Sequence, residues 1–185
     1  TMSDIYKVAE EKMNKSVNAM LNEYAAIRAG RANPAVLDRV EVEYYGAPTP
    51  LNQMAAISVP DARTLVVQPW DKSSLKDIER GILTADIGIN PQNDGSVIRL
   101  VFPPLTEERR REIGKNIFKL AEDCKIAIRS IRRDAMDKLK DQKKKAEITE
   151  DDLKVAEKDL QKLTDDMCKE VDALLEKKEK ELMAV

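Results

Sequence analysis

The sequence predicts an α+β fold, an elongated three-helix bundle with a small inserted α/β domain, which together make a two-arm molecule. Residues 3–29, 105–145 and 149–182 each carry apolar side chains at the spacing of a helix that buries one face. Residues 30–104 differ, because they hold the prolines, five of the six glycines and the only tryptophan. That composition is typical of short strands and turns, so this region is predicted to be a separate domain.

The segment from residue 105 to 145 organises the chain, because it contains no proline and reads as one helix. At 1.5 Å rise per residue it would be about 55 to 60 Å long. Its apolar stripe has a mean spacing of about 3.7 residues, which favours a nearly straight bundle over a left-handed supercoil. Pro103 and Pro104 mark the start of the helix, and Thr106 is its predicted cap. The stripe consists of Ile113, Ile117, Leu120, Cys124, Ile128, Ile131, Ala135 and Leu139.

The first and third helices are delimited by their capping residues. Ser3 or Asp4 is the predicted cap of the first helix, and Gly30 stops it. Thr149 and Asp152 have the spacing of a capping box at the start of the third helix. The second and third helices are similar in length and closely connected, so they are predicted to pair antiparallel, with the first helix completing the bundle.

The inserted region shows alternating apolar residues separated by turn signals. Asn90-Pro91 and Asn93-Asp94-Gly95 are predicted turns. The other expected elements, in chain order, are a strand at 40–45 that ends at Gly46, a turn-rich Ala47–Pro50, strands at 56–59 and 64–68, a helix at 74–85 and a strand at 97–102.

The predicted domain boundaries follow from these elements. Residues 1–30 and 105–185 form the bundle, and residues 31–104 form the inserted domain. The chain therefore passes between the domains twice at one end of the bundle, and this predicts a two-stranded hinge. The expected hinge residues are Gly30, Arg31, Pro103, Pro104 and Thr106.

Composition excludes several classes of protein. The 185 residues include no histidine, which removes the commonest general base and the commonest metal ligand. No apolar run approaches the length of a bilayer span and no signal peptide is evident, so the cytoplasm is the predicted compartment. Cys124 and Cys168 lack metal-ligand spacing and are expected to be free thiols. No Gly-rich phosphate loop is present, and neither a cofactor nor a metal is expected.

Basic residues gather on one flank of the long helix. Lys125, Arg129, Arg132 and Arg133 lie on neighbouring turns, with no acidic residue between positions 124 and 133. Guanidinium groups make bidentate contacts with phosphate, which favours RNA binding. The alternative is a solvated face paired with acidic neighbours, since residues 105–148 carry a net charge of +5 and residues 149–185 a net charge of −5.

Two further sets of residues each have a functional and a structural interpretation. Arg28 and Arg31 flank Gly30 and either bind RNA or satisfy carbonyl groups at the end of the first helix. The aromatic residues Tyr44, Tyr45 and Trp70 are spaced unlike a stacking platform, so packing in the core is predicted for them.

Several segments of the chain, in order, resemble the ribosome recycling factor family. They are IRAGRANP from Ile27, VEYYGAPTPLNQMA from Val42, NPQNDGSVIRLVFPPLTEERR from Asn90, IRSIRRDAMDKLK from Ile128, and the late QKLTDDM and ELM. Ser130 stands where the family more often has asparagine, and the flanking arginines are kept. The resemblance covers essentially the whole chain and implies an L-shaped molecule of a three-helix bundle plus an α/β domain.

The resemblance also implies a function. A member of this family is expected to bind the post-termination ribosome through the 23S rRNA of the large subunit, and to split the subunits together with elongation factor G and GTP. It implies a monomer with no active site and with no membrane or DNA partner. From the residues alone, a structural helical scaffold and an enzyme of unknown chemistry also remain open.

Overall fold

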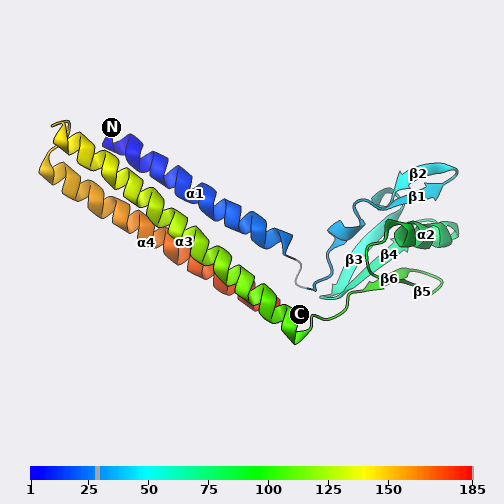
Figure 1. Cartoon of the computed structure of the whole chain (residues 1–185). Coiled ribbons are helices and arrows are strands. Elements are labelled where there is room, and N and C mark those ends of the chain that lie inside the picture. The colour runs from blue at the N-terminus through cyan, green and yellow to red at the C-terminus, as the bar shows by residue number, and fades with distance from the viewer. Residues whose placement is uncertain (28–29, 185) are drawn as a thin grey trace. The chain divides into compact units, whose positions relative to one another are not determined.

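The structure is a computed structural model that describes residues 1–27 and 30–184. The chain divides into two compact units. One unit is a helical bundle of α1 (Met2–Ala26), α3 (Glu107–Lys144) and α4 (Glu150–Met183). The other is the inserted unit, which contains the strands and α2 (Leu75–Ala85) (Figure 1). The predicted α+β class, a helical bundle with a small inserted sheet domain, is confirmed.

Capping residues set the starts of the bundle helices. The Thr1 hydroxyl oxygen accepts a hydrogen bond from the Asp4 amide, and the Asp4 carboxylate accepts one from the N-terminal ammonium group, so a capping box starts α1. The predicted cap at Ser3 or Asp4 is therefore wrong, because Asp4 is the third residue of the box. Thr149 and Asp152 form the predicted box at the start of α4.

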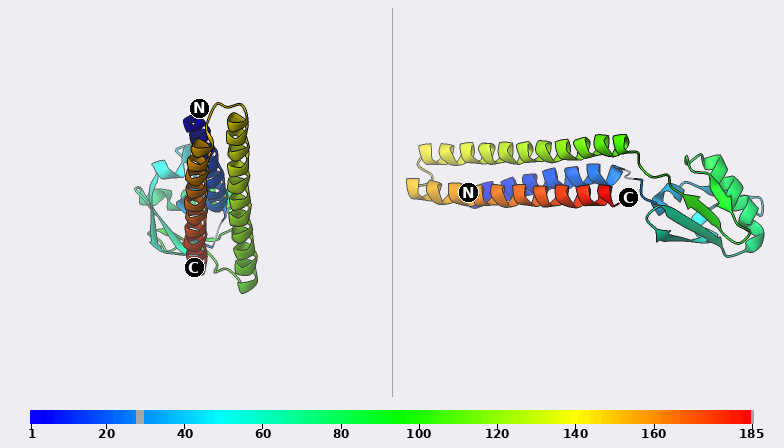
Figure 2. Two further views of the ribbon diagram at one scale, coloured as in Figure 1. Left: turned by 90° about the vertical axis from the view of Figure 1, so that its left-hand side faces the viewer. Right: turned by 90° about the horizontal axis from the view of Figure 1, so that it is seen from below.

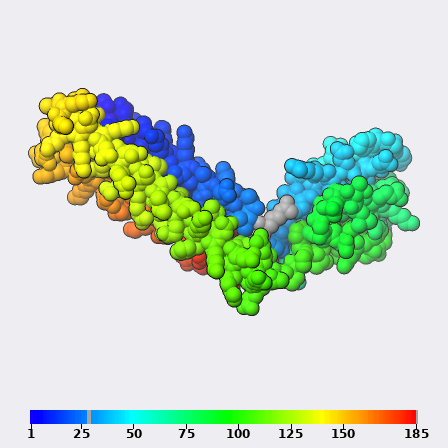
Figure 3. Space-filling view, in the orientation of Figure 1, coloured from blue at the N-terminus to red at the C-terminus, as the bar shows by residue number. Residues whose placement is uncertain are grey.

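The bundle core is built from the apolar stripes of its helices. α3 and α4 run antiparallel, joined by a short turn after Lys144 (Figure 2), and α1 lies along α3 (Figure 3). Ile117 and Ile128 of α3 are fully buried, as are Met13 of α1 and Val171 of α4. This arrangement confirms the antiparallel pairing and the helical stripes predicted from the sequence.

One buried tyrosine links α1 to α3 by a polar contact. The Tyr24 hydroxyl donates a 2.8 Å hydrogen bond to the Ile117 carbonyl. Burial, with smaller contributions from Cys124 and Glu179, raises the pKa of Tyr24 to about 12. The phenol therefore stays neutral and can act as a donor throughout the physiological range.

The inserted unit contains a hairpin and a larger antiparallel sheet. β1 (Glu41–Tyr44) pairs with β2 (Ala47–Pro50). The sheet follows the order β3-β4-β6-β5. Its strands are β3 (Ala55–Asp61), β4 (Thr64–Pro69), β5 (Pro91–Asn93) and β6 (Ile98–Val101), and short 3-10 turns span Pro34–Leu37, Leu51–Gln53 and Lys72–Ser74.

α2 covers one face of this sheet, and their side chains form the core of the inserted unit. Leu65 and Val67 of β4 alternate inward, and they pair in register with Leu100 and Ile98 of β6. Ile78 and Ile82 of α2 complete this core together with side chains of the β1 region. α2 approaches β1 very closely at Gly81, where a Cβ atom would lie 2.8 Å from the Glu41 carbonyl oxygen.

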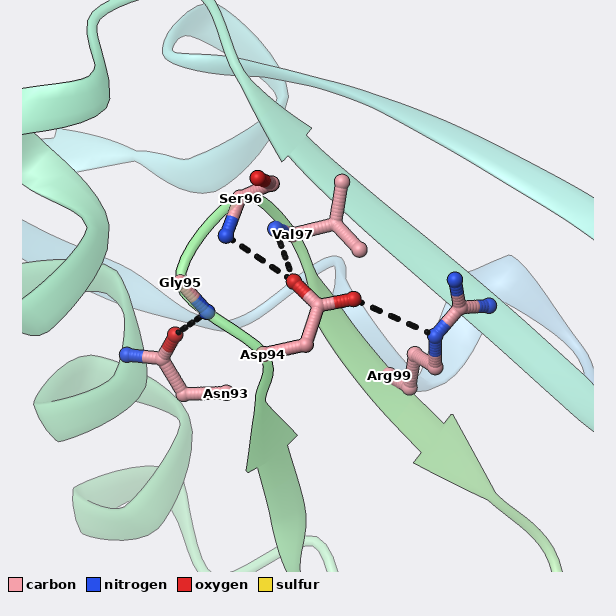
Figure 4. A network of polar contacts seen from close by, with 6 residues as sticks. All are labelled: Asn93, Asp94, Gly95, Ser96, Val97 and Arg99. Atoms are coloured by element: carbon pink, nitrogen blue, oxygen red, sulfur yellow. Dashed lines mark hydrogen bonds and ion pairs between the residues drawn. The ribbon is translucent and has the colours of Figure 1, made fainter.

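The turn between β5 and β6 is fixed by side chains that bond the backbone (Figure 4). Asn93 accepts a hydrogen bond from the Gly95 amide, and Asp94 accepts two, from Ser96 and Val97. The bonds from Val97 and Ser96 hold the pKa of Asp94 below its usual value, with a smaller contribution from Arg99, 3.5 Å away. This turn was predicted from its Asn-Asp-Gly sequence, and it is confirmed.

Two strands were missed in the sequence because they contain proline. Ala47–Pro50 was predicted to be a turn, but it is the strand β2, which lies at the edge of its sheet. Proline has no N–H group to donate, and an edge strand tolerates it where that position faces away from the neighbouring strand. The turn itself lies at Tyr45 and Gly46, which both have positive φ. Pro91 was likewise assigned to a turn but begins the short edge strand β5.

The predicted burial of the aromatic residues is wrong for two of the three. Tyr44 is half-buried against the core, but Trp70 is 67% exposed and Tyr45 is 87% exposed. The reason is strand alternation. Val42 and Tyr44 point inward on β1 and Leu65, Val67 and Pro69 point inward on β4, so the residue that follows each strand points outward.

Candidate nucleic-acid interface

The candidate interface lies on the flank of α3 that borders α4. Arg129 and Arg133 are one helical turn apart, and Arg132 occupies the neighbouring row closer to the core. Arg129 and Arg133 are exposed, whereas Arg132 is half-buried. The structure therefore brings these three predicted residues together on one surface.

None of these three arginine side chains forms an ion pair or a hydrogen bond with the described residues, 1–27 and 30–184. The charge of Arg129 nevertheless reaches α4, where it opposes the burial that raises the pKa of Cys168. Guanidinium groups that have no carboxylate partner in their own chain remain available for phosphate. The arrangement matches a phosphate-binding surface better than a salt-bridged helix face.

Lys125 behaves differently from the arginines beside it. Its ammonium group lies 2.9 Å from Asp172 of α4 and 2.9 Å from Glu122, and its side chain is only 15% exposed. Asp172 and then Glu122 raise the pKa of Lys125 through these contacts. Lys125 therefore joins α3 to α4, and among the four basic residues of this flank it is the one that pairs with acidic neighbours in the described part of the chain.

A groove lined by more basic than acidic residues continues along the same flank toward the start of α3. Its charged lining residues are Arg110, Arg111, Lys115, Glu107 and Glu179. Arg111 and Lys115 line an open cavity of about 750 Å³ between α3 and the end of α4. Phe118 and Met183, both more than half exposed, supply its apolar side. This groove was not predicted from the sequence, although helical spacing places Arg111 and Arg129 on one row of α3.

The two connectors between the units contain the other predicted residues. Arg28 lies outside the described residues. Arg31 is exposed, and Gly30 has a φ of 71°, a left-handed conformation that favours glycine. Pro103, Pro104 and Thr106 form an exposed stretch without regular structure before α3.

Both connectors leave the inserted unit at the same place. The Ala32 amide donates to the Ala62 carbonyl at 2.8 Å, and the Phe102 amide donates to the Arg63 carbonyl at 2.7 Å. These carbonyl groups belong to adjacent residues of the β3–β4 turn. Ala32 and Phe102, near the two ends of the inserted unit, are therefore held next to each other.

The described residues contain no group of three or more His, Cys, Asp or Glu side chains placed to hold a metal ion. Among the same residues, no helix is both long and apolar enough to cross a bilayer.

Comparison with known proteins identifies the family. The sequence model described as "Ribosome recycling factor" matches residues 20–183. The chain belongs to this family. The "Ribosome-recycling factor" of Clostridium kluyveri is 58% identical over 184 residues, which cover 100% of both chains. That of Acetivibrio thermocellus is 60% identical over 182 residues, 98% of this chain and 100% of the relative.

Solved structures of the family agree with this assignment. A solution structure of the ribosome recycling factor matches with a TM-score of 0.68 and 41% identity, over 100% of this chain and 98% of that one. A second structure has a TM-score of 0.58 and 46% identity, covering 98% of both chains. It describes the T. thermophilus ribosome recycling factor and the E. coli elongation factor G bound to the E. coli post-termination complex.

Proposed function

We propose that this protein binds the post-termination ribosome through the rRNA of the large subunit and splits the subunits together with elongation factor G and GTP. The observation that carries the proposal is the flank of Arg129, Arg132 and Arg133, whose guanidinium groups have no acidic partner in the described part of the chain. The family relative seen with elongation factor G on a post-termination complex supports the choice of partners.

In this proposal the protein acts by binding and holds no active site of its own. The arginines contact rRNA phosphates, and the groove of Arg111, Lys115 and Phe118 extends the contact, since an exposed aromatic ring can stack on an unpaired base. GTP is bound and hydrolysed by the elongation factor. The protein works as a monomer in the cytoplasm, where its substrate is the ribosome.

The hinge has a role in the same proposal. The two connectors start from one turn of the inserted unit, so they act as a paired tether that resists twisting more than a single linker would. Gly30, Arg31, Pro103, Pro104 and Thr106 are the residues that allow the two units to move while the bundle stays anchored. The units, residues 1–30 with 105–185 and residues 31–104, are proposed to fold as separate domains.

The proposal is tested by removing two charges from the arginine flank. We expect Arg129→Ala with Arg132→Ala to weaken binding to large subunits while the melting temperature changes little, because neither side chain is paired within the described chain. The affinity falls as salt rises, and each lost phosphate contact should make this dependence less steep, by somewhat less than one in the slope of log K against log salt concentration. Sedimentation with purified large subunits at several KCl concentrations measures both the affinity and the slope.

The matched control removes the same number of charges from the other side of the bundle. Lys12 of α1 and Lys138 of α3 are exposed and line a cavity between these two helices, so Lys12→Ala with Lys138→Ala should leave the affinity nearly unchanged. Equal losses in the two double variants would show that binding senses only net charge. Full subunit splitting by the arginine variant at limiting protein concentration would contradict the proposed surface.

A further inference from the structure

The inserted unit exposes aromatic side chains on one part of its surface. Only 4% of the residues in the chain are aromatic, yet Trp70 is 67% exposed and Tyr45 is 87% exposed. A tryptophan left in water gains nothing from burial, and exposed Trp and Tyr side chains are enriched at interfaces. These residues belong to the inserted unit, whereas the arginine flank belongs to the bundle.

Tyr45 is held in a conformation that is unusual for its type. It forms the β1–β2 turn with Gly46, with φ values of 51° and 79°. Asparagine before glycine suits such a turn, whereas a bulky residue at positive φ is strained. The ring is mostly in water, with one edge-to-face contact to Tyr44 at 4.5 Å. A turn selected for stability alone would not contain tyrosine here, which points to recognition.

The aromatic residues are connected through Asp71. The Tyr44 hydroxyl donates to Asp71 Oδ2 at 3.3 Å, and Asp71 follows Trp70 in the chain. Between them is a depression of about 190 Å³. Its lining residues are Tyr44, Thr49, Gln53, Met54, Trp70, Asp71 and Ser74. Aromatic rings, a carboxylate and a small depression thus form one continuous surface, called the aromatic face below.

The charge of the aromatic face selects its partner. Asp71 accepts hydrogen bonds from the Ser73 hydroxyl at 2.7 Å and the Ser73 amide at 3.0 Å, and these bonds lower its pKa, so it is ionised at neutral pH. Within the described chain no lysine or arginine pairs with Asp71. Residues 30–106 hold 7 basic and 9 acidic residues, so this unit does not attract phosphate as the arginine flank does.

We propose that the aromatic face is a docking site for a protein segment that presents an arginine beside an apolar side chain. The guanidinium group stacks on the Trp70 indole and pairs with Asp71, while the apolar neighbour enters the depression. This inference rests on the proposed function, because the segment belongs to a protein component of the complex in which the subunits are split.

The test places a photo-crosslinker on the aromatic face of the full chain. Tyr45 is replaced by p-benzoylphenylalanine, and the protein is irradiated with purified post-termination ribosomes, elongation factor G and GTP. We expect a crosslink to a protein, mapped by mass spectrometry to a peptide that contains arginine. Trp70→Ala or Asp71→Asn should each reduce the yield about tenfold, as truncation of a central interface residue does.

The variants separate binding from folding. Asp71→Asn keeps the oxygen that accepts from Ser73 and removes the charge, while the Oδ2 that accepts from the Tyr44 hydroxyl becomes an amide nitrogen. Lys72→Ala, beside it, removes an exposed cation and should leave the yield unchanged or higher. Crosslinking to rRNA, or a protein crosslink that Asp71→Asn does not weaken, would overturn the docking site.

Subunit splitting, followed by light scattering in the same mixture, distinguishes the two proposals. Splitting without any crosslink overturns the docking site and leaves the proposed function standing. If the unmodified protein fails to split ribosomes, and the protein with p-benzoylphenylalanine neither splits them nor forms a crosslink, both the docking site and the proposed function are overturned.

Discussion

Replacing Gly81 by alanine should destabilise the inserted unit, although alanine is the better helix former. The added Cβ atom would lie 2.8 Å from the Glu41 carbonyl oxygen and 3.1 Å from a Val42 methyl group. Ordinary contacts begin near 3.4 Å, so β1 or α2 must move by about 0.6 Å. The obstacle is backbone of a paired strand next to the buried Val42, and it cannot rotate away as a flexible side chain would.

The magnitude follows from two opposing effects. Alanine gains about 1 kcal/mol over glycine inside a helix, while overpacking a rigid core costs about 1–3 kcal/mol. A backbone obstacle places the cost near the upper end of that range, so we expect a net loss of about 1–2 kcal/mol. Hydrogen exchange of the α2 and β4 amides, read by mass spectrometry, measures the stability of this unit separately from the bundle.

Gly114 provides the matched control in the other unit. It also lies inside a helix, α3, but an added Cβ atom would meet only Leu182 Cδ2, at an ordinary 3.9 Å. Gly114→Ala should therefore stabilise the bundle by about 0.5–1 kcal/mol. Gly81→Ala with unchanged or slower exchange in α2 would refute the reasoning, since the close approach to β1 would then impose no cost.

Two further substitutions test single contacts. Tyr24→Phe removes the hydrogen bond to Ile117 and should cost the bundle about 1 kcal/mol in urea unfolding at pH 8. Burial raises the pKa of Tyr24 to about 12 from an ordinary 10, so this tyrosine stabilises the bundle below pH 10 and loses that effect as the pH rises through 12. The phenylalanine variant should not show this loss of stability at high pH. Identical pH profiles of the two proteins would contradict the assignment to Tyr24. Tyr45→Asn should raise the stability of the inserted unit by roughly 1 kcal/mol, since relief of left-handed strain outweighs one exposed aromatic contact. A lower urea midpoint would show instead that the contact with Tyr44 dominates.

The helices were predictable because their signals are local and repeated. The apolar stripe of α3 recurs over about seven turns, so one residue that breaks the pattern does not hide it. Thr149 with Asp152 fixes the start of α4 within one turn of chain. The strands β2 and β5 were missed because proline usually indicates a turn in the sequence. Proline is nevertheless tolerated in a strand at the edge of a sheet, at positions where no N–H group has to pair with a neighbouring strand.

The candidate sites show a second limit of sequence reasoning. Spacing placed Lys125 with the arginines, but it cannot show that Asp172, 47 residues later, lies 2.9 Å from the Lys125 ammonium group. The exposure of Trp70 could have been predicted, because the alternation of Leu65 and Val67 along β4 directs the Trp70 side chain away from the core. It was missed because aromatic residues are more often buried than exposed.

The two adjacent attachment points on the β3–β4 turn also bear on how the chain is synthesised and folded. α1 ends at Ala26 and α3 begins at Glu107, so about 80 residues separate them. At about 5–20 residues synthesised per second, α3 begins to emerge roughly 4 to 16 seconds after α1. During that time the contiguous inserted unit can form its own core. By joining Ala32 and Phe102 to one turn, it shortens the loop that must close when α1 docks on α3 from about 80 residues to about 10. Three halvings of loop length lower the entropic cost of closure by about 2 kcal/mol, so the inserted unit acts as a staple for the bundle.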